Sequence, residues 1–334
     1  MPVKKGTKGL IACYKGTTGF GKIYKGTTLV FSSETYPEGF IKPRVVLGSE
    51  NTNIYYYMNG EQQNIGIPND NTDKNGFIDK STVHNDTVLY IPSYNNNKIV
   101  DNIYPNALAN SFSIYPNITS IVLGEGIRTL MASSLRYDRS DNNAAVKPTN
   151  YPKLVLPSSL KSLYSSNIFK YINLYKVKTS DYNYYILSSV LTDSIFSGSI
   201  IDECIADSTI LENDSTFILN GAKFKKLDIK DISYIGEYNF NNIEVSDMLV
   251  IHNSVSNIGK KAFNSISNTP NIRFNHLVND TISFTLDGSQ GPFYAKTVRN
   301  INIYTDSADI KNHDWSGAEN ITATFYHLDG TVWS

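Results

Sequence analysis

The stretch Val245–Phe263, VSDMLVIHNSVSNIGKKAF, contains the pattern of apolar residues from which the fold can be predicted. Its apolar positions are Leu249, Ile251, Val255 and Ile258, followed by the pair Ala262-Phe263. This spacing fits neither the period of a helix nor a long strict alternation. It describes a short strand, a turn, a second short extended piece and a closing apolar pair. Because a single segment of this kind has no apolar surface to pack against, the pattern predicts that it stacks on copies of itself.

Three other stretches repeat this order of apolar residues: Phe224–Phe240, Ile118–Leu135 and Tyr151–Phe169. The two best units begin 22 residues apart, from Leu227 to Leu249, a length in the range of leucine-rich solenoids. We expect the shared positions to form the repeat core. They are Ile121, Leu123, Ile127, Leu130, Leu154, Leu156, Leu160, Leu163, Leu227, Ile229, Ile232, Ile235, Leu249, Ile251, Val255, Ile258 and Phe263.

At these residues the chain resembles the BspA-like class of leucine-rich repeat, whose consensus runs approximately L-x-x-I-x-I-P-x-S-V-x-x-I-G-x-x-A-F. The Val245 unit keeps Ser254-Val255, Ile258-Gly259 and Ala262-Phe263, and it carries His252 where the consensus has Pro. The Tyr151 unit keeps Pro157-Ser158. The resemblance implies a mainly β fold, a leucine-rich-repeat solenoid preceded by an N-terminal β-rich region, in a family that consists mostly of binding and surface proteins.

The Tyr151 unit departs from the consensus at its end, where Asn167-Ile168 stand in the place of Ala-Phe. The segment Ile301–Trp315 and the following ENITATFYHLDGT are similar to the closing segments of BspA-like arrays. They would cover the last apolar layer with side chains such as Trp315 and Trp333. Exposed aromatic residues for carbohydrate or protein contact are the alternative reading.

Composition and patterning divide the chain into four parts. We expect an N-terminal hairpin or anchor at 1–50, a β-rich domain at 51–110, the repeat array at 111–300 and a C-terminal cap at 301–334. Within the array, residues 171–220 should hold one or two degenerate units and an insertion.

The N-terminal part has a repeat of its own, since Tyr14-Lys-Gly-Thr-Thr18 recurs as Tyr24-Lys-Gly-Thr-Thr28. This Gly/Thr pattern resembles N-terminal segments of repeat-bearing virion proteins of gut-bacterial phages, including crAss-like phages. The resemblance implies an anchor that docks on a larger assembly. The alternative is a solvated basic tail, because six lysines precede the first acidic residue, Glu34.

Two short motifs suggest ligand sites. Gly16–Lys22 has the spacing of a phosphate-binding loop, but Ile23 replaces the required Ser or Thr and the next residues are patterned as a strand, so we reject it. The second motif has oxygen-bearing side chains spaced as in a calcium loop. It lacks the bidentate Glu, and an Asn-Gly hairpin turn is the alternative. Calcium is the cofactor that this motif would bind. Its ligands would be Asn71, Asp73, Asn75 and Asp79.

Composition excludes several classes of protein. The 334 residues are 40% hydrophobic and 12% aromatic, which is enough for a core, and the net charge of −1 argues against general nucleic-acid binding. Cys13 and Cys204 form neither a zinc motif nor a disulfide framework. The N-terminus lacks the apolar region of a secretory signal, and no stretch approaches the length of a membrane span.

We expect a non-enzymatic structural or fibre protein of a bacteriophage virion, oligomeric in an assembly, because none of the histidines lies in a catalytic motif. The N-terminal region would anchor it, and the repeats would contact other virion proteins or a host surface protein or glycan. The first alternative is a cell-surface or secreted bacterial adhesin. The second is a glycan-acting enzyme with a shallow site, which would need a cluster of perturbed carboxylates.

Overall fold

The computed structural model describes most of the chain, which forms two compact units, Met1–Phe40 and Ile41–Ser334. The described residues are 36–48, 83, 85–95, 97–108, 112, 115–138, 148–164, 166–185 and 194–333, with the backbone of strands within 14–32, 56–65 and 139–146.

The first unit contains two short antiparallel ladders. β1 (Tyr14–Lys15) pairs with β2 (Thr18–Gly19), and β3 (Lys22–Lys25) pairs with β4 (Thr28–Ser32). The two Tyr-Lys-Gly-Thr-Thr copies take equivalent registers, Lys15 opposite Thr18 and Lys25 opposite Thr28. Because Lys22 opens a strand and not a helix, the anion-binding geometry of a phosphate loop is absent there.

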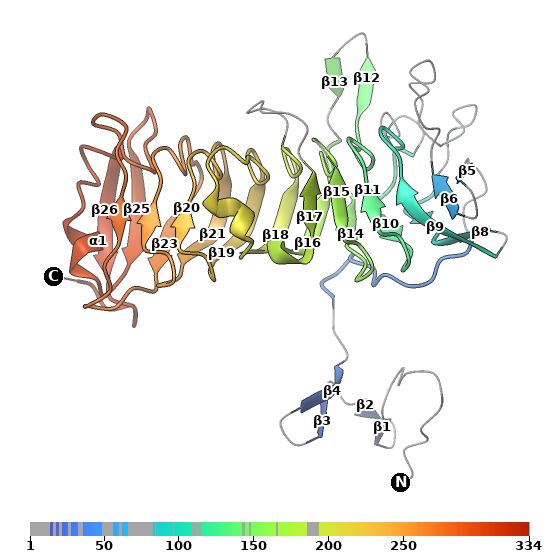
Figure 1. Cartoon of the computed structure of the whole chain (residues 1–334), viewed down its shortest axis with the longest axis horizontal. Helices are drawn as coiled ribbons and strands as arrows, with labels where there is room; N and C mark the ends of the chain where they lie inside the picture. The colour runs from blue at the N-terminus through green and yellow to red at the C-terminus, as the bar shows by residue number, and fades with distance from the viewer. Residues whose placement is uncertain are drawn as a thin grey trace. The chain divides into compact units, whose positions relative to one another are not determined.

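The second unit is a β-solenoid whose largest sheet has ten strands, each paired in parallel with the next coil (Figure 1). In spatial order they are β7 (Val88–Ile91), β10 (Ser120–Leu123), β14 (Lys153–Val155), β16 (Asn173–Lys178), β18 (Ile200–Ala206), β19 (Lys223–Ile229), β21 (Glu244–Ile251), β23 (Asn271–Phe274), β25 (Arg299–Tyr304) and β26 (Ile321–Tyr326). This arrangement is the mainly β leucine-rich-repeat solenoid that the apolar spacing predicts.

Shorter strands line the opposite side of the coils. One parallel row contains β9 (Lys98–Ile103), β11 (Thr129–Leu130), β15 (Ser162–Tyr164) and β17 (Asn183–Tyr185); a second contains β20 (Tyr234–Ile235), β22 (Asn257–Ile258) and β24 (Ser283–Phe284). The remaining elements are β5 (Tyr56–Asn59), β6 (Gln62–Ile65), β8 (Tyr94–Asn95), β12 (Arg139–Asp141), β13 (Ala144–Val146), two 3₁₀ turns at Thr179–Asp181 and Thr209–Glu212, and α1 (Ala308–Asn312).

A column of apolar side chains runs along the solenoid axis inside the coils. Phe240 stacks on Phe263 with ring centroids 5.0 Å apart, and Phe263 stacks on Phe293 at 4.5 Å. In the same column Phe169 stacks on Phe196 at 5.1 Å. Offset aromatic stacking adds to the free energy of area burial, so the closing Phe of the repeat holds neighbouring coils together.

This column changes the alignment of the Tyr151 unit by one residue. Phe169, and not Ile168, fills the closing position, because Leu135 N–H donates to Ile168 O and Phe169 N–H donates to Ile195 O in the same pattern. The unit has one extra residue between Leu163 and the closing pair. A loop can accommodate the extra residue. Counting from Leu163 by the spacing of the other units therefore assigns the closing position to Ile168 instead of Phe169.

The array extends beyond the boundaries expected from the sequence. β7 and β9 lie before residue 111, β25 crosses residue 300 and β26 lies after it, yet all four continue the parallel sheets. Residues 171–220 contribute two long strands, β16 and β18, so this segment is part of the array. From the sequence these coils look degenerate because Cys204 and Ala206 stand where the Phe224 unit has Leu227 and Ile229.

Candidate contact surface

The outer side of the ten-stranded sheet carries a band of charged residues across β16, β18, β19 and β21. Leu174, Val177, Cys204 and Leu227 are buried, while the charged side chains of the same strands are exposed or half-buried. We call this band the charged face. Its residues are Lys176, Lys178, Asp202, Glu203, Lys223, Lys225, Lys226, Asp228 and Asp247.

Most of these charges pair across adjacent strands. Lys225 Nζ lies 2.7 Å from Asp202 Oδ1, and Lys176 Nζ lies 3.6 Å from Glu203 Oε2. Lys176, Glu203 and Lys225 are about half exposed and Asp202 is 11% exposed. Ion pairs with a solvent-exposed lysine contribute at most about 1 kcal/mol each to folding. The charged face therefore adds little to stability, and its fixed arrangement is available for contact with another molecule.

Lys226 differs from its neighbours on the charged face. It is exposed and lies in register with Met248 on β21 and with Glu203 on β18, whose carboxylate pairs with Lys176. Among the described residues Lys226 has no ion-pair partner of its own. It follows that Lys226 is the cation that a partner carboxylate could meet without displacing an existing ion pair.

A buried amide fixes the turn that supports this part of the sheet. Asn239 Oδ1 accepts hydrogen bonds from Thr216 N–H and Thr216 Oγ1, and Asn239 Nδ2 donates to the carbonyls of Leu211 and Asn213. Both lone pairs of the amide oxygen and both N–H groups of the side chain are therefore used. Such a saturated network favours one turn geometry.

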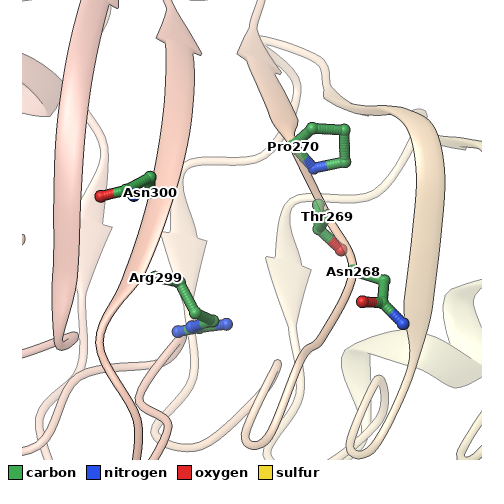
Figure 2. Close-up of a pocket in the computed structure, with 5 residues that line it drawn as sticks. All are labelled: Asn268, Thr269, Pro270, Arg299 and Asn300. Atoms are coloured by element: carbon green, nitrogen blue, oxygen red, sulfur yellow. The ribbon is translucent and has the colours of Figure 1, made fainter.

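A polar groove opens between the coils that precede β23 and β25. Figure 2 shows its residues, which contribute to a hollow of about 410 Å³: Asn268, Thr269, Pro270, Arg299 and Asn300. A second hollow of about 380 Å³ shares Asn268 and Arg299 and is lined also by Ser265 to Ser267 and Ala295 to Thr297. Both hollows are lined by a mixture of polar and apolar surface, with hydroxyl and amide side chains among the lining residues.

Arg299 is not free to bind a ligand in this groove. Its guanidinium donates to the carbonyls of Ile266, Phe293 and Glu319, and burial lowers its pKa. The Glu319 carboxylate is fully buried and accepts hydrogen bonds from Phe293 N–H (2.7 Å) and His313 Nε2 (2.8 Å). Burial raises the Glu319 pKa. These contacts tie the coil of β25 to the closing segment, which is a structural role.

The residues predicted from the sequence take different places. All the predicted repeat-core residues are buried except Leu156, which is half-buried, so none of them is available to a partner. The calcium candidates Asn71, Asp73, Asn75 and Asp79 lie outside the described residues. The described residues bring together no group of three or more His, Cys, Asp or Glu side chains able to hold a metal ion.

The histidines do not gather at one site. His252 Nε2 lies 2.6 Å from Asp228 Oδ1 on the charged face, His276 is buried, and His313 contacts Glu319. His327 lies beside Asp306. Within the described part of the chain, no helix is long and apolar enough to cross a membrane.

Sequence reasoning did not identify the charged face, Asn239 or Glu319. The alternation of lysine and acid with apolar residues in KFKKLDI and IIDECIA was the signal that could have found the charged face. No local pattern marks Asn239 or Glu319, since their partners come from other coils.

Comparison with known proteins gives two similar structures. No protein-family model matches the chain, and no curated protein matches it. The chain is similar to a leucine-rich repeat protein from Bacteroides ovatus, at 14% identity and a TM-score of 0.33, over 84% of this chain and 76% of that one. It is also similar to the pneumococcal vaccine antigen PcpA, at 11% identity and a TM-score of 0.26, over 85% of this chain and 98% of that one. The fold itself rests on the strand pairing described above.

Proposed function

We propose that this chain is a non-enzymatic structural or fibre protein of a bacteriophage virion. Its N-terminal unit anchors it, and its solenoid contacts other virion proteins or a host surface. The observation that supports a contact role most directly is the charged face, a rigid array of outward side chains held in register by parallel strands. Extended ordered surfaces of this kind suit binding to macromolecules.

The division into two compact units supports the anchoring part of the proposal. Residues 1–40 form a unit of their own, and they include the Gly/Thr repeats that resemble the N-terminal segments of phage virion proteins. A small two-hairpin unit is marginal in isolation, so docking on an assembly would stabilise it. Many copies in one particle would give avidity to contacts that are individually weak.

Gradient-purified particles from the source culture test the virion role. We expect the chain to co-purify at a fixed copy number through high-salt washing, as measured by quantitative peptide mass spectrometry. Its absence from particles, with recovery on cells or in the medium, would refute the virion role and favour the adhesin alternative.

A pair of charge reversals tests which face makes the contact. We expect Lys226→Glu to reduce incorporation into particles, because it adds a carboxylate to the charged face. Lys161→Glu is the matched control, because Lys161 is also exposed but lies just before β15, in the row of shorter strands. If both variants are incorporated into particles as well as the wild type is, the charged face is not the contact surface.

A further inference from the structure

A third hollow, separate from the charged face, lies at the C-terminal end of the solenoid. Its volume is about 430 Å³, within the range of small-molecule sites. The loops that follow β23, β25 and β26 form its walls, so three successive coils contribute to it. The lining residues are Leu277, Val278, Asn279, Asp306, Ala308, His327 and Trp333.

One part of the hollow is apolar and open to solvent. Leu277 is 56% exposed and Val278 is 71% exposed, and both lie beside the hollow that Trp333 also lines. Large aliphatic side chains on a monomer surface that share a hollow with an aromatic ring commonly mark a binding site. The wall can therefore accept the apolar surface of a ligand.

Trp333 is held in place by its neighbours. The His327 ring stacks on it with centroids 4.5 Å apart and an interplanar angle of 20°, and Lys311 Nζ lies 4.9 Å from its centroid. The backbone N–H of Trp333 donates to Phe325 O, which fixes the chain along the edge of β26. A ring positioned in this way loses little conformational entropy when a ligand binds.

The polar groups of the hollow are mainly acceptors. Asp306 Oδ1 accepts hydrogen bonds from His327 Nδ1 (2.8 Å) and from Leu328 N–H (3.3 Å). When Nδ1 carries the proton, Nε2 of the neutral imidazole is an acceptor. Among the described residues, neither Asp306 Oδ2 nor His327 Nε2 has a hydrogen-bond partner. Asn279 adds an exposed amide that can donate and accept.

Charge decides between two kinds of ligand that could donate to these acceptors. An ammonium group would be repelled by Lys311, whose Nζ already lies over the indole where a cation would bind. A neutral polyol meets no such repulsion. Its hydroxyl groups can donate to Asp306 and His327 while its C–H surface packs on Leu277 and Val278, with Trp333 bounding the hollow beside them.

We propose that this hollow is a binding site for a neutral pyranose sugar, as the terminal residue of a glycan. The ring's C–H face packs on the apolar wall, and two of its hydroxyl groups donate to Asp306 Oδ2 and His327 Nε2. The site is built from loops away from the charged face, and its assignment does not depend on the proposed virion role.

Saturation-transfer difference NMR on the full chain tests the site with four defined probes: methyl α-mannoside, methyl β-galactoside, methyl β-glucoside and N-acetylglucosamine. We expect at least one probe to receive saturation and to bind with a Kd on the order of 1 mM, as for a small ligand with few contacts. Trp333→Ala and Asp306→Asn should each weaken that binding by at least about tenfold. Tyr185→Ala, which removes an exposed aromatic ring elsewhere on the solenoid, should leave it unchanged.

Each variant's thermal unfolding is measured alongside, and Asp306→Asn, which keeps the size of the side chain, covers the case in which Trp333→Ala does not fold. Three results would overturn the proposal: no transfer to any of the four sugars, equal binding by the Asp306→Asn variant, or displacement of the sugar by the methyl ester of N-acetyl-lysine, which would reveal an ammonium site. None of these results bears on incorporation into particles.

Discussion

His276 is a fully buried imidazole at the turn after β23. Its Nε2 lies 2.7 Å from Val255 O, and within the described residues its Nδ1 has no hydrogen-bond partner. Burial lowers the His276 pKa below the ordinary value of 6.5, and nearby His252 acts in the same direction. The contact with Val255 O and the charge of Asp280 oppose the shift.

The sign of the pH effect follows from this shift. Because the unfolded chain binds the His276 proton more readily than the folded chain does, the stability contributed by neutral His276 is present above pH 6.5 and declines as the pH falls through the folded pKa. We expect His276→Gln, which keeps a donor for Val255 O and does not titrate, to lose less stability between about pH 7.5 and about pH 5 than the wild type. Urea unfolding at both pH values measures this. Equal losses would contradict it.

Phe263 lies in the middle of the aromatic column, stacked on both Phe240 and Phe293. We expect Phe263→Ala to lower the free energy of unfolding by about 3–5 kcal/mol, because it leaves a cavity bounded by two coils. Phe263→Leu should cost less than about 1.5 kcal/mol, since it conserves most of the volume. Leu135 fills the same place in an earlier coil. Denaturant unfolding separates the two variants, and a loss below about 1 kcal/mol for Phe263→Ala would show that the column does not hold the coils together.

At this scale the sequence predicts burial better than it predicts alignment. The apolar positions of the units are buried because their spacing reflects the pleat of the strand directly. That Phe169 and not Ile168 fills the closing position could not be predicted, because an inserted residue in a turn leaves no local pattern in the sequence. Glu319 was equally hidden, because its partners Phe293 and His313 belong to segments that only the coiling brings together.

At the scale of the elements, turns and strands are stabilised by different interactions. The strands rely on apolar burial and parallel hydrogen bonds, and their outward ion pairs are exposed. The turns rely on buried polar side chains such as Asn239, whose loss would leave backbone groups without partners. A buried group without its hydrogen bond costs about 1–3 kcal/mol, which is larger than the contribution of an exposed ion pair.

This contrast yields a paired prediction. Asn239→Ala removes the acceptor for Thr216 N–H and the donor for two carbonyls, so we expect a loss of about 3 kcal/mol. Lys225→Ala breaks the ion pair with Asp202 and should cost less than about 1 kcal/mol. Thermal unfolding monitored by circular dichroism ranks the two. A Lys225→Ala variant that is the less stable of the pair would show that the charged face is a structural element and not a contact surface.

The solenoid is a stack in which each coil contacts mainly its neighbours, so a local loss of stability need not spread along it. The fold class could be predicted from four units because the same pattern of apolar residues recurs in each of them. The limits of the array could not, since terminal coils replace the repeat's apolar residues with the polar and aromatic groups of a cap. β26 shows this, because it pairs with the large sheet although its residues do not match the consensus.

The separation of residues 1–40 from the solenoid leads to the last prediction. Because the chain divides into compact units at Phe40, deletion of Met1–Phe40 should leave the solenoid core intact. We expect the melting temperature of the truncated chain to lie within about 3 °C of that of the full chain, a change of less than about 1 kcal/mol. If the N-terminal unit is an anchor, the same truncation should abolish incorporation into particles.

The two readouts distinguish the possible roles of the N-terminal unit. A truncated chain that melts normally but is absent from particles would support an anchor, since folding and docking would then depend on different residues. A large fall in melting temperature would contradict the division into independent units. Normal melting together with normal incorporation would refute the anchor, and the contact with the particle would then have to be made by the solenoid.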